Sequence, residues 1–424
     1  MEERKNNKKV EYDNIKRKCC DEQKEKWNAI VDSGGNLEAV KMEMFDYYTE
    51  LRQTLLEVPD DEYVSREMSN MFEKMVELAE YKGGSNLGTH YFQVRRGINP
   101  EAPTAFMMAV MGPGEVARNS LIGESYLPSS LNKVQLLYFG KDVTGILNET
   151  CRDMLKLKNV YFNVDSSCLS IGNSAFENTS LEEIVIPDSV KTLDYGCFAY
   201  CEYMKKITIG KNVTEIWHNA FYNCAKLKEI YIPDSVKLLG DQCFRMNTEM
   251  GYEGGIVKIS GMKGVEKIGE QAFDGTEIVD FTGGPNLKSI GGMCFIGTPL
   301  ESLTLYWNDE LEIGSGAFEN LDYLEVVNLV GGNSKKWVGK LKGQFFNCYL
   351  IDNLAVAYGD QIKVIRERNG YDESVDDAVI YIAYARILEQ EAAQLLKGGG
   401  TKVQIPSDIS RFIATGFSPA TSLF

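Results

Sequence analysis

The sequence predicts an α+β protein in which a solenoid of short parallel β-strand coils is flanked by helical segments. Three observations lead to this fold class. A motif of 22 or 23 residues recurs through the middle of the chain, its strand-like part alternates polar and apolar residues, and both flanks carry apolar residues at helical spacing. The chain has 424 residues, of which 44% are hydrophobic and 25% charged, so it has ample apolar material for a core.

The N-terminal region, residues 1–84, is predicted to be helical. Asn36 can cap a helix that ends before Pro59 and carries its apolar positions at Leu37, Val40, Met44, Tyr47, Leu51 and Leu55. Asp60 or Asp61 can cap the next helix, which ends at Gly83–Gly84 and whose apolar stripe comprises Val64, Met68, Met71, Phe72, Met75, Leu78 and Ala79. A weaker, more charged helical segment precedes them at about Tyr12–Ile30.

A short segment then connects the helices to the repeats. Residues 85–130 are mixed in character and rich in Gly and Pro. We expect them to form an irregular linker that acts as the N-terminal cap of the first coil, because the end of a solenoid otherwise exposes apolar side chains.

The repeats occupy residues 131–356. Successive stretches from Ile171, Leu193 and Ile216 each contain a small residue and Phe, then L/M-x-x-I-x-I, then P/G-x-x-V-x-x-I/L. In the first of these, Ile184 and Ile186 should point inward, with residues 183 and 185 pointing outward. One coil cannot bury its apolar residues alone, so the pattern predicts stacked coils with paired equivalent strands. The anchoring phenylalanines are Phe176, Phe198, Phe221, Phe244, Phe273, Phe295, Phe318 and Phe345.

This unit resembles the BspA-like leucine-rich repeats, whose consensus is close to LxxIxIPxSVxxIGxxAFxxC. The segment IPDSV occurs twice, at Ile186 and Ile232. The resemblance implies a right-handed leucine-rich-repeat solenoid with a parallel sheet on its concave side. It also implies non-catalytic protein binding, often in surface adhesins and, for some members, in phage or other assemblies.

Residues 357–424 are predicted to form a helical C-terminal cap and a docking tail. The segment Ser374–Lys397 begins with acidic residues, carries a broad apolar face and ends at Gly398–Gly400, as expected of a helix. We expect this helix either to cover the last coil near Val356 or to bind another chain. The tail after Arg411 is uncharged and is expected to dock onto another surface.

The sequence offers no arrangement typical of an active site, a cofactor site or a metal site. Only two histidines are present, His90 and His218, far apart in the sequence. Cysteines precede the anchoring Phe in three coils, where other coils have alanine, so we expect them to be small buried fillers: Cys197, Cys243 and Cys294. We therefore expect no enzymatic activity and no cofactor.

Charge and targeting patterns restrict the partners and the location. The formal net charge of −16 argues against binding to nucleic acids or anionic membranes, because both are negative themselves. The charged N-terminus does not resemble a secretory signal, and no apolar run is long enough for a membrane helix. We expect a cytoplasmic protein, or a virion component if the chain belongs to a virus particle.

The outward positions of the strands form the candidate protein-binding face. Such mixed polar and aromatic positions suit protein recognition, although any solvated sheet has a similar composition. An insertion at residues 247–255, NTEMGYEGG, lengthens one coil by six residues and offers a second candidate surface, as do the helical flanks. The candidate positions on the strands are Tyr138, Tyr161, Glu183, Val185, Lys206, Thr208, Glu229, Tyr231, Lys258, Asp280, Thr304 and Asn328.

Two functions remain open on these observations. The chain is either an interaction scaffold that presents the repeats to a protein partner or a structural component of a large assembly. In the second case, such as a phage virion, the helical flanks dock onto neighbours or onto further copies, and the exposed repeats serve adhesion or host attachment.

Overall fold

The computed structural model describes residues 37–57, 62–77, 80–81, 89–95, 104–118, 133–345 and 359–384, together with a few isolated positions. The chain divides into two compact units. The first unit comprises residues 1–144 and 159–166, and the second comprises residues 145–158 and 167–424. Among the described helices, none combines the length and apolar character that a membrane-spanning segment needs.

The first unit begins with the two helices that the sequence predicts. Helix α2 spans Leu37–Glu57 and helix α3 spans Glu62–Glu77. The expected apolar stripes are buried wherever the structure describes them, which confirms the helical spacing. The buried members of these stripes are Met44, Tyr47, Leu51, Val64, Met68, Met71, Phe72 and Met75. Leu78, Ala79 and most of the segment 12–30 lie outside the described residues.

The sheet of the first unit starts antiparallel and then becomes parallel. Strand β1 (Glu80–Tyr81) pairs antiparallel with β2 (Thr89–Arg95), and β2 pairs antiparallel with β3 (Thr104–Val110). Strand β3 then pairs in parallel with β5 (Leu136–Phe139), which pairs in parallel with β7 (Asn159–Phe162). A further short strand, β4, spans Gly114–Val116.

The prediction of an irregular segment at residues 85–130 is therefore wrong for β2, β3 and β4. The apolar run of β3 pairs in register with β5, so that Met107 lies opposite Leu136 and Val110 opposite Phe139. Parallel pairing thus begins at β3, one strand before the first recognisable repeat. The backbone of β3 hydrogen-bonds to β5, whose N–H and C=O groups would otherwise be unpaired at the edge of the sheet.

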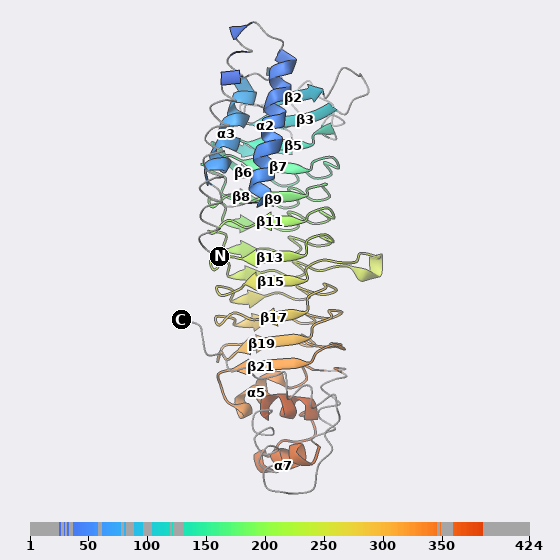
Figure 1. Cartoon of the computed structure of the whole chain (residues 1–424). Coiled ribbons are helices and arrows are strands. Elements are labelled where there is room, and N and C mark those ends of the chain that lie inside the picture. Colours follow the sequence, from blue (N-terminus) through green and yellow to red (C-terminus); the bar gives the residue numbers. More distant parts are fainter. Residues whose placement is uncertain are drawn as a thin grey trace, which may run out of the picture. The chain divides into compact units, whose positions relative to one another are not determined.

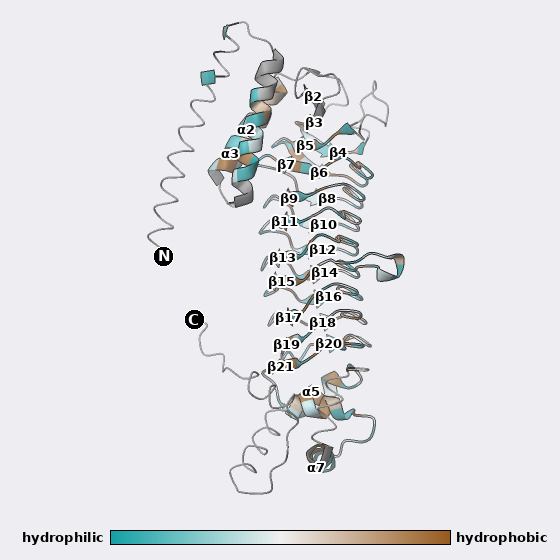
Figure 2. Cartoon of the chain, turned by 45° about the vertical axis from the view of Figure 1, so that its right-hand side comes forward, coloured by the Kyte–Doolittle hydropathy of each residue, from teal (hydrophilic) through white to brown (hydrophobic). Residues whose placement is uncertain are grey.

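The second unit is a stack of coils, and each coil contains one longer and one shorter strand. Figure 2 shows the longer strands and the shorter strands as two separate rows. The longer strands follow one another along one side of the stack: β9 (Glu183–Val185), β11 (Lys206–Thr208), β13 (Glu229–Ile232), β15 (Lys258–Gly261), β17 (Asp280–Thr282), β19 (Ser302–Tyr306) and β21 (Val326–Val330). Hydrogen-bonded pairing joins β9 to β11 and, in a separate sheet, β13 through β21; we call this side the longer-strand ladder. The shorter strands form another: β6 (Val143–Ile146, shared with the first unit), β8 (Ser170–Ile171), β10 (Thr192–Leu193), β12 (Glu215–Ile216), β14 (Leu238–Leu239), β16 (Lys267–Ile268), β18 (Ser289–Ile290) and β20 (Glu312–Ile313). The pairs within each ladder are parallel.

The anchoring phenylalanines stack into a continuous column inside the coils. Neighbouring ring centroids are 5.3 to 5.7 Å apart from Phe176 to Phe345. Phe244 and Phe273 are separated by 29 residues yet lie 5.6 Å apart, like their neighbours. The insertion therefore leaves the column intact and is accommodated outside it.

A left-handed backbone position explains a second recurring feature of the repeats. Two residues after the anchoring Phe, many coils carry Asn or Gly, and these residues have positive φ, as at Asn178 (56°), Asn223 (58°) and Gly275 (70°). Asn and Gly adopt this conformation at the lowest cost, so the corner of each coil selects them.

The stack ends differently from the prediction. Helix α5 (Ser334–Leu341) follows β21 and buries Trp337, Val338 and Leu341, although the sequence assigned this stretch to the repeats. The Trp337 ring packs edge-on against Trp307 at 4.9 Å, and its Nε1 donates a hydrogen bond to Gly331 O. A solenoid end needs such a cover, and α5 provides it before the predicted cap begins.

The C-terminal flank contains one further helix that the sequence analysis missed. Helix α7 spans Gly359–Asn369, and the helix predicted at Ser374–Lys397 is described as helical at residues 377–384. Arg366 on α7 donates to Asp377 Oδ1 at 2.6 Å and to Val375 O at 2.8 Å, so the two helices are joined at this corner. Figure 1 labels α5 and α7 after the last strands.

Candidate protein-binding face

The outward side of the longer-strand ladder in the second unit, here called the strand face, consists of two rows of side chains. Each coil contributes one residue to each row because alternate residues of a strand point to the same side. The first row runs through Glu183, Lys206, Glu229, Lys258, Asp280, Ser302 and Val326, and the second through Val185, Thr208, Tyr231, Ser260, Thr282, Thr304 and Asn328.

Charges alternate in sign along the first row. Glu183 lies opposite Lys206 in the register of β9 and β11, and Lys258 lies opposite both Glu229 and Asp280. Opposite charges on neighbouring strands attract each other, so this row stabilises the stacking of coils and carries little net charge. It therefore presents a partner with a pattern of alternating charges rather than with a strong electrostatic field of one sign.

The second row is uncharged and contains the most prominent apolar groups of the face. Val185 is 55% exposed and Tyr231 is 59% exposed, whereas the inward-pointing Ile184 and Ile230 between these rows are buried. This arrangement confirms the predicted alternation of the strands. Two further residues, Tyr306 and Val330, lie opposite each other where β19 and β21 extend beyond the other strands. The predicted face did not include them, although the alternation of SLTLY continues through Tyr306.

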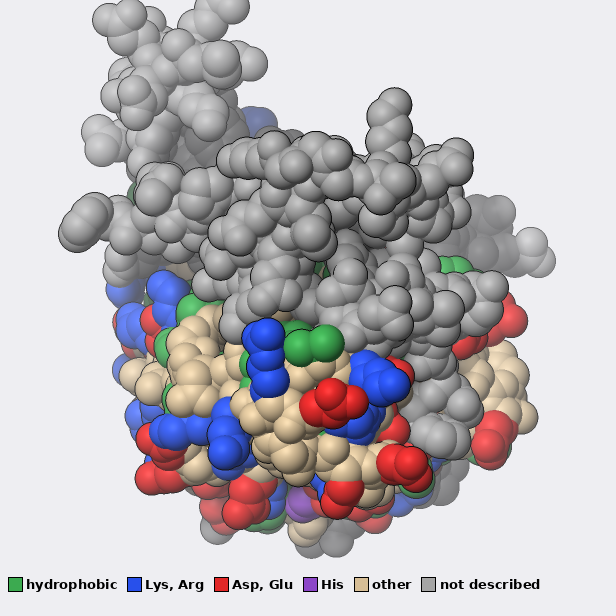
Figure 3. Space-filling model, turned by 90° about the horizontal axis from the view of Figure 1, so that it is seen from below, with side chains coloured by type: hydrophobic (Ala, Val, Ile, Leu, Met, Phe, Trp, Pro, Cys, Tyr) green, Lys and Arg blue, Asp and Glu red, His purple; other side chains and the backbone are tan. Residues whose placement is uncertain are grey.

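Ion pairs between successive coils border the strand face. Glu182 lies 3.1 Å from Lys158 Nζ and 3.4 Å from Lys205 Nζ. Burial by itself raises the pKa of the Glu182 carboxyl, but these two cations outweigh it, so the pKa is lowered overall. Beside the shorter strands, Glu266 likewise lies between Lys237 and Lys288. On the face seen from below, Figure 3 shows acidic and basic side chains interspersed among the described residues. Such exposed pairs contribute little stability individually, about 0–1 kcal/mol each.

Two of the predicted face residues are covered by helices, Tyr138 completely and Tyr161 in part. Tyr138 is 1% exposed, because its ring stacks on Phe72 of α3 with centroids 4.6 Å apart. The Tyr161 hydroxyl lies 3.2 Å from that of Tyr48 on α2. Including Tyr138 was therefore wrong, and Tyr161 is partly covered by α2 and α3 of the same unit.

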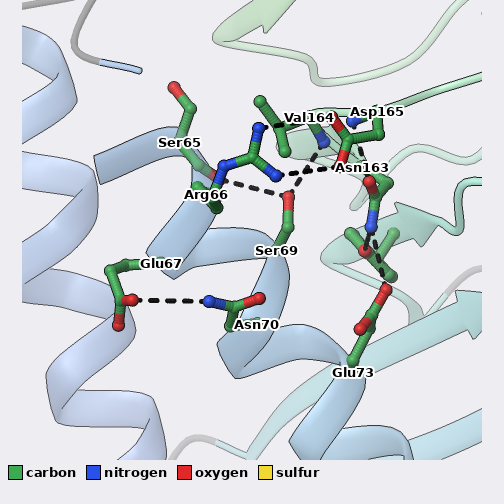
Figure 4. A network of polar contacts seen from close by, with 10 residues as sticks. Ser65, Arg66, Glu67, Ser69, Asn70, Glu73, Asn163, Val164 and Asp165 are labelled. Carbon is green, nitrogen blue, oxygen red and sulfur yellow. Dashed lines mark hydrogen bonds and ion pairs between the residues drawn. The ribbon is translucent and has the colours of Figure 1, made fainter. Parts of the chain in front are cut away.

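Polar contacts fix α3 onto this sheet, as Figure 4 shows. Asn163 donates hydrogen bonds to the Tyr138 hydroxyl at 2.8 Å and to Glu73 Oε1 at 2.9 Å. The Val164 amide donates to Ser69 Oγ, and Arg66 forms an ion pair with Asp165 at 2.9 Å. Burial strongly raises the pKa of the Tyr138 phenol, which stays protonated as part of this contact.

The reactive residue types occupy structural positions. The thiols of Cys197, Cys243 and Cys294 are fully buried at equivalent corners, and burial raises the pKa of each well above its ordinary value. His218 Nδ1 accepts a hydrogen bond from the Asp241 amide at 2.8 Å. Among the described residues, no three His, Cys, Asp or Glu side chains are grouped closely enough to hold a metal ion.

The repeats match the model of the BspA type leucine-rich repeat region in six copies, at residues 122–251 and 252–368. These residues make up more than half of the chain. The chain belongs to the BspA-type leucine-rich repeat family. The family region extends to residue 368, so it includes α5 as well as the coils.

Solved structures of leucine-rich repeat proteins resemble this BspA-type chain. The pneumococcal vaccine antigen PcpA is 15% identical, with 60% of this chain and 82% of that one covered and a TM-score of 0.34. A leucine-rich repeat protein of T. pallidum is 17% identical, with 61% and 96% covered and the same TM-score. A leucine-rich cell surface protein of Faecalibacterium prausnitzii is 17% identical, with 57% and 75% covered and a TM-score of 0.29. No curated protein matches the chain.

Proposed function

We propose that this chain is a non-catalytic scaffold that binds a protein partner through the strand face of its second unit. Membership in the BspA-type family supports a role in protein binding or surface adhesion. The observation that carries the proposal is the second row of the strand face, where Val185 and Tyr231 protrude beside a row of alternating charges.

The composition of this surface favours a protein over other ligands. Tyrosine supplies a large, rigid contact area and a hydroxyl that can donate or accept, and such residues concentrate binding energy at the centre of interfaces. The alternating charges of the first row would also fix how a partner is aligned along the coils. A partner with the opposite alternation is attracted in one alignment and repelled when it is shifted by one coil.

The test combines Tyr231→Ala with Lys206→Glu in the full chain. Loss of an aromatic anchor commonly costs 2 kcal/mol or more, so the double variant should bind the natural partner about 30-fold more weakly. The partner is first captured from the source cells with the wild-type chain, identified by mass spectrometry and purified, and its affinity is then titrated. Neither substituted side chain supports the core, and circular dichroism verifies the fold.

Tyr323→Ala provides a matched control, because Tyr323 is 62% exposed but lies at a corner of another coil, away from the strand rows. It should bind with wild-type affinity. Equal affinity of the folded double variant and the wild type would refute the strand face as the binding site.

A further inference from the structure

The insertion at residues 247–255 brings together an aromatic surface that regular coils lack. Tyr252 from the insertion packs edge-on against Tyr200, with ring centroids 5.9 Å apart, and Tyr200 packs in the same manner against Tyr222 at 5.5 Å. Tyr195, which is 50% exposed, accepts a hydrogen bond from Asn219 beside them. We call Tyr195, Tyr200, Tyr222 and Tyr252 the tyrosine patch; Tyr222 is 9% exposed and forms its buried base, while the other three rings are accessible.

The insertion has a defined conformation that holds this patch in place. Asn247 donates through Nδ2 to the Tyr222 hydroxyl at 2.8 Å, and its amide donates to Asn223 Oδ1 at 2.7 Å. Its side chain also accepts from the amide of Met250, which closes a 3-10 turn. Figure 1 shows the insertion extending beyond the neighbouring coils, between β13 and β15.

A glycine fixes the return of the insertion to the coil. Gly254 has φ of 104°, and a Cβ at this position would lie 2.5 Å from Ala225 O. Only glycine combines this backbone angle with such a close approach. Because the phenylalanine column passes this coil without distortion, the insertion adds surface rather than core.

The charge around the tyrosine patch is negative. Glu202, Glu249 and Glu253 are exposed carboxylates on the insertion and on the coil that carries Tyr200. Two cations near the insertion are paired with carboxylates: Arg245 Nε lies 2.7 Å from Asp274 Oδ2, and Lys228 Nζ lies 2.6 Å from Glu277 Oε2. The whole chain carries a net charge of −16, so a second copy of it would be repelled.

The rings of the patch suit a cationic ligand as well. Burial raises the pKa of the Tyr200 and Tyr252 phenols, and neighbouring hydroxyls and carboxylates add to the effect, so the rings stay neutral. The quadrupole of a neutral ring attracts a cation placed over its face. One coil corner already shows this contact, because Lys226 Nζ lies 4.5 Å from the centroid of the Tyr203 ring.

We propose that the tyrosine patch is a second docking surface, separate from the strand face, for an arginine- or lysine-bearing segment of a partner protein. The aromatic faces take the cationic side chains, and the surrounding carboxylates attract the segment and set the salt dependence of binding.

The probe for this proposal is a fluorescently labelled peptide of alternating Arg and Gly, titrated with the full chain by fluorescence anisotropy. A peptide in which Glu replaces Arg is the charge-reversed control. We expect the Arg peptide to bind and the Glu peptide not to bind, with affinity falling as salt is raised. Tyr252→Ala should weaken binding about tenfold, whereas Tyr252→Phe, which keeps the ring, should stay within about twofold of wild type.

Two further variants make the result specific to the patch. Tyr323→Ala removes an exposed tyrosine elsewhere, and Tyr231→Ala alters the strand face, so both should bind the Arg peptide like the wild type. Absence of Arg-peptide binding, equal binding of both peptides, or an undiminished affinity of folded Tyr252→Ala would overturn the proposal. An equal loss in Tyr323→Ala would overturn it too, because the binding would then not depend on the insertion.

Discussion

Phe221→Ala tests the physical basis of the coil stack. Phe221 is 1% exposed and lies between Phe198 and Phe244, with ring centroids 5.6 and 5.4 Å away. Replacement by alanine removes the transfer free energy of a buried ring and leaves a cavity, which costs about 3–5 kcal/mol for Phe→Ala. Because two stacked neighbours lose their partner at once, we expect a value at the upper end of this range.

The assay is urea denaturation followed by circular dichroism, with the free energy of unfolding extrapolated to water. Hydrogen exchange adds a spatial measurement, because coupled coils should lose protection on both sides of residue 221. Phe221→Leu, which keeps an apolar side chain, should cost less than half as much, and exposed Tyr323→Ala should cost less than about 0.5 kcal/mol. A cost below about 1 kcal/mol for Phe221→Ala, or protection lost in one coil alone, would refute the stacked column as the main source of stability.

Three further predictions follow from buried contacts at other places. Phe72→Ala removes the ring that stacks on Tyr138, so it should destabilise the first unit by about 3–5 kcal/mol in urea denaturation, and unchanged stability would show that α3 does not depend on this contact. Trp337→Ala should cost about 3–5 kcal/mol and expose the last coil to the dye ANS, and an unchanged dye signal would contradict the role of α5 as the end cover. Burial raises the pKa of the Cys201 thiol from 9.0 to about 11, so on raising the pH the thiol ionises first in the unfolded chain. The stability that the buried, protonated thiol contributes is therefore complete below pH 9 and should be lost between pH 9 and 11. Denaturation of Cys201→Ala and of the wild type across this range should show a smaller decline of stability with pH in the variant.

The sequence by itself determined the repeat and its register. The spacing of the phenylalanines, the alternation in strands such as Glu183–Val185 and the Asn or Gly at most corners are local requirements that recur from coil to coil. Each requirement involves residues of one coil and their equivalents 22 or 23 positions away, so it appears as a periodic pattern. Helices α2 and α3 could be predicted for the same reason, because one apolar stripe is visible within each helix.

Tertiary structure decided which outward positions are covered. Tyr138 and Tyr231 occupy comparable places in their strands, yet Tyr138 lies under α3 and Tyr231 is 59% exposed. The repeat pattern could not distinguish them, because packing between segments far apart in the sequence leaves no periodic signal. The only local sign is that β5, LLYF, is apolar without interruption and buried on both sides, whereas β13, EIYI, alternates. The tyrosine patch depends in the same way on residues from three coil corners, and the folding of the insertion back onto Tyr200 brings them together.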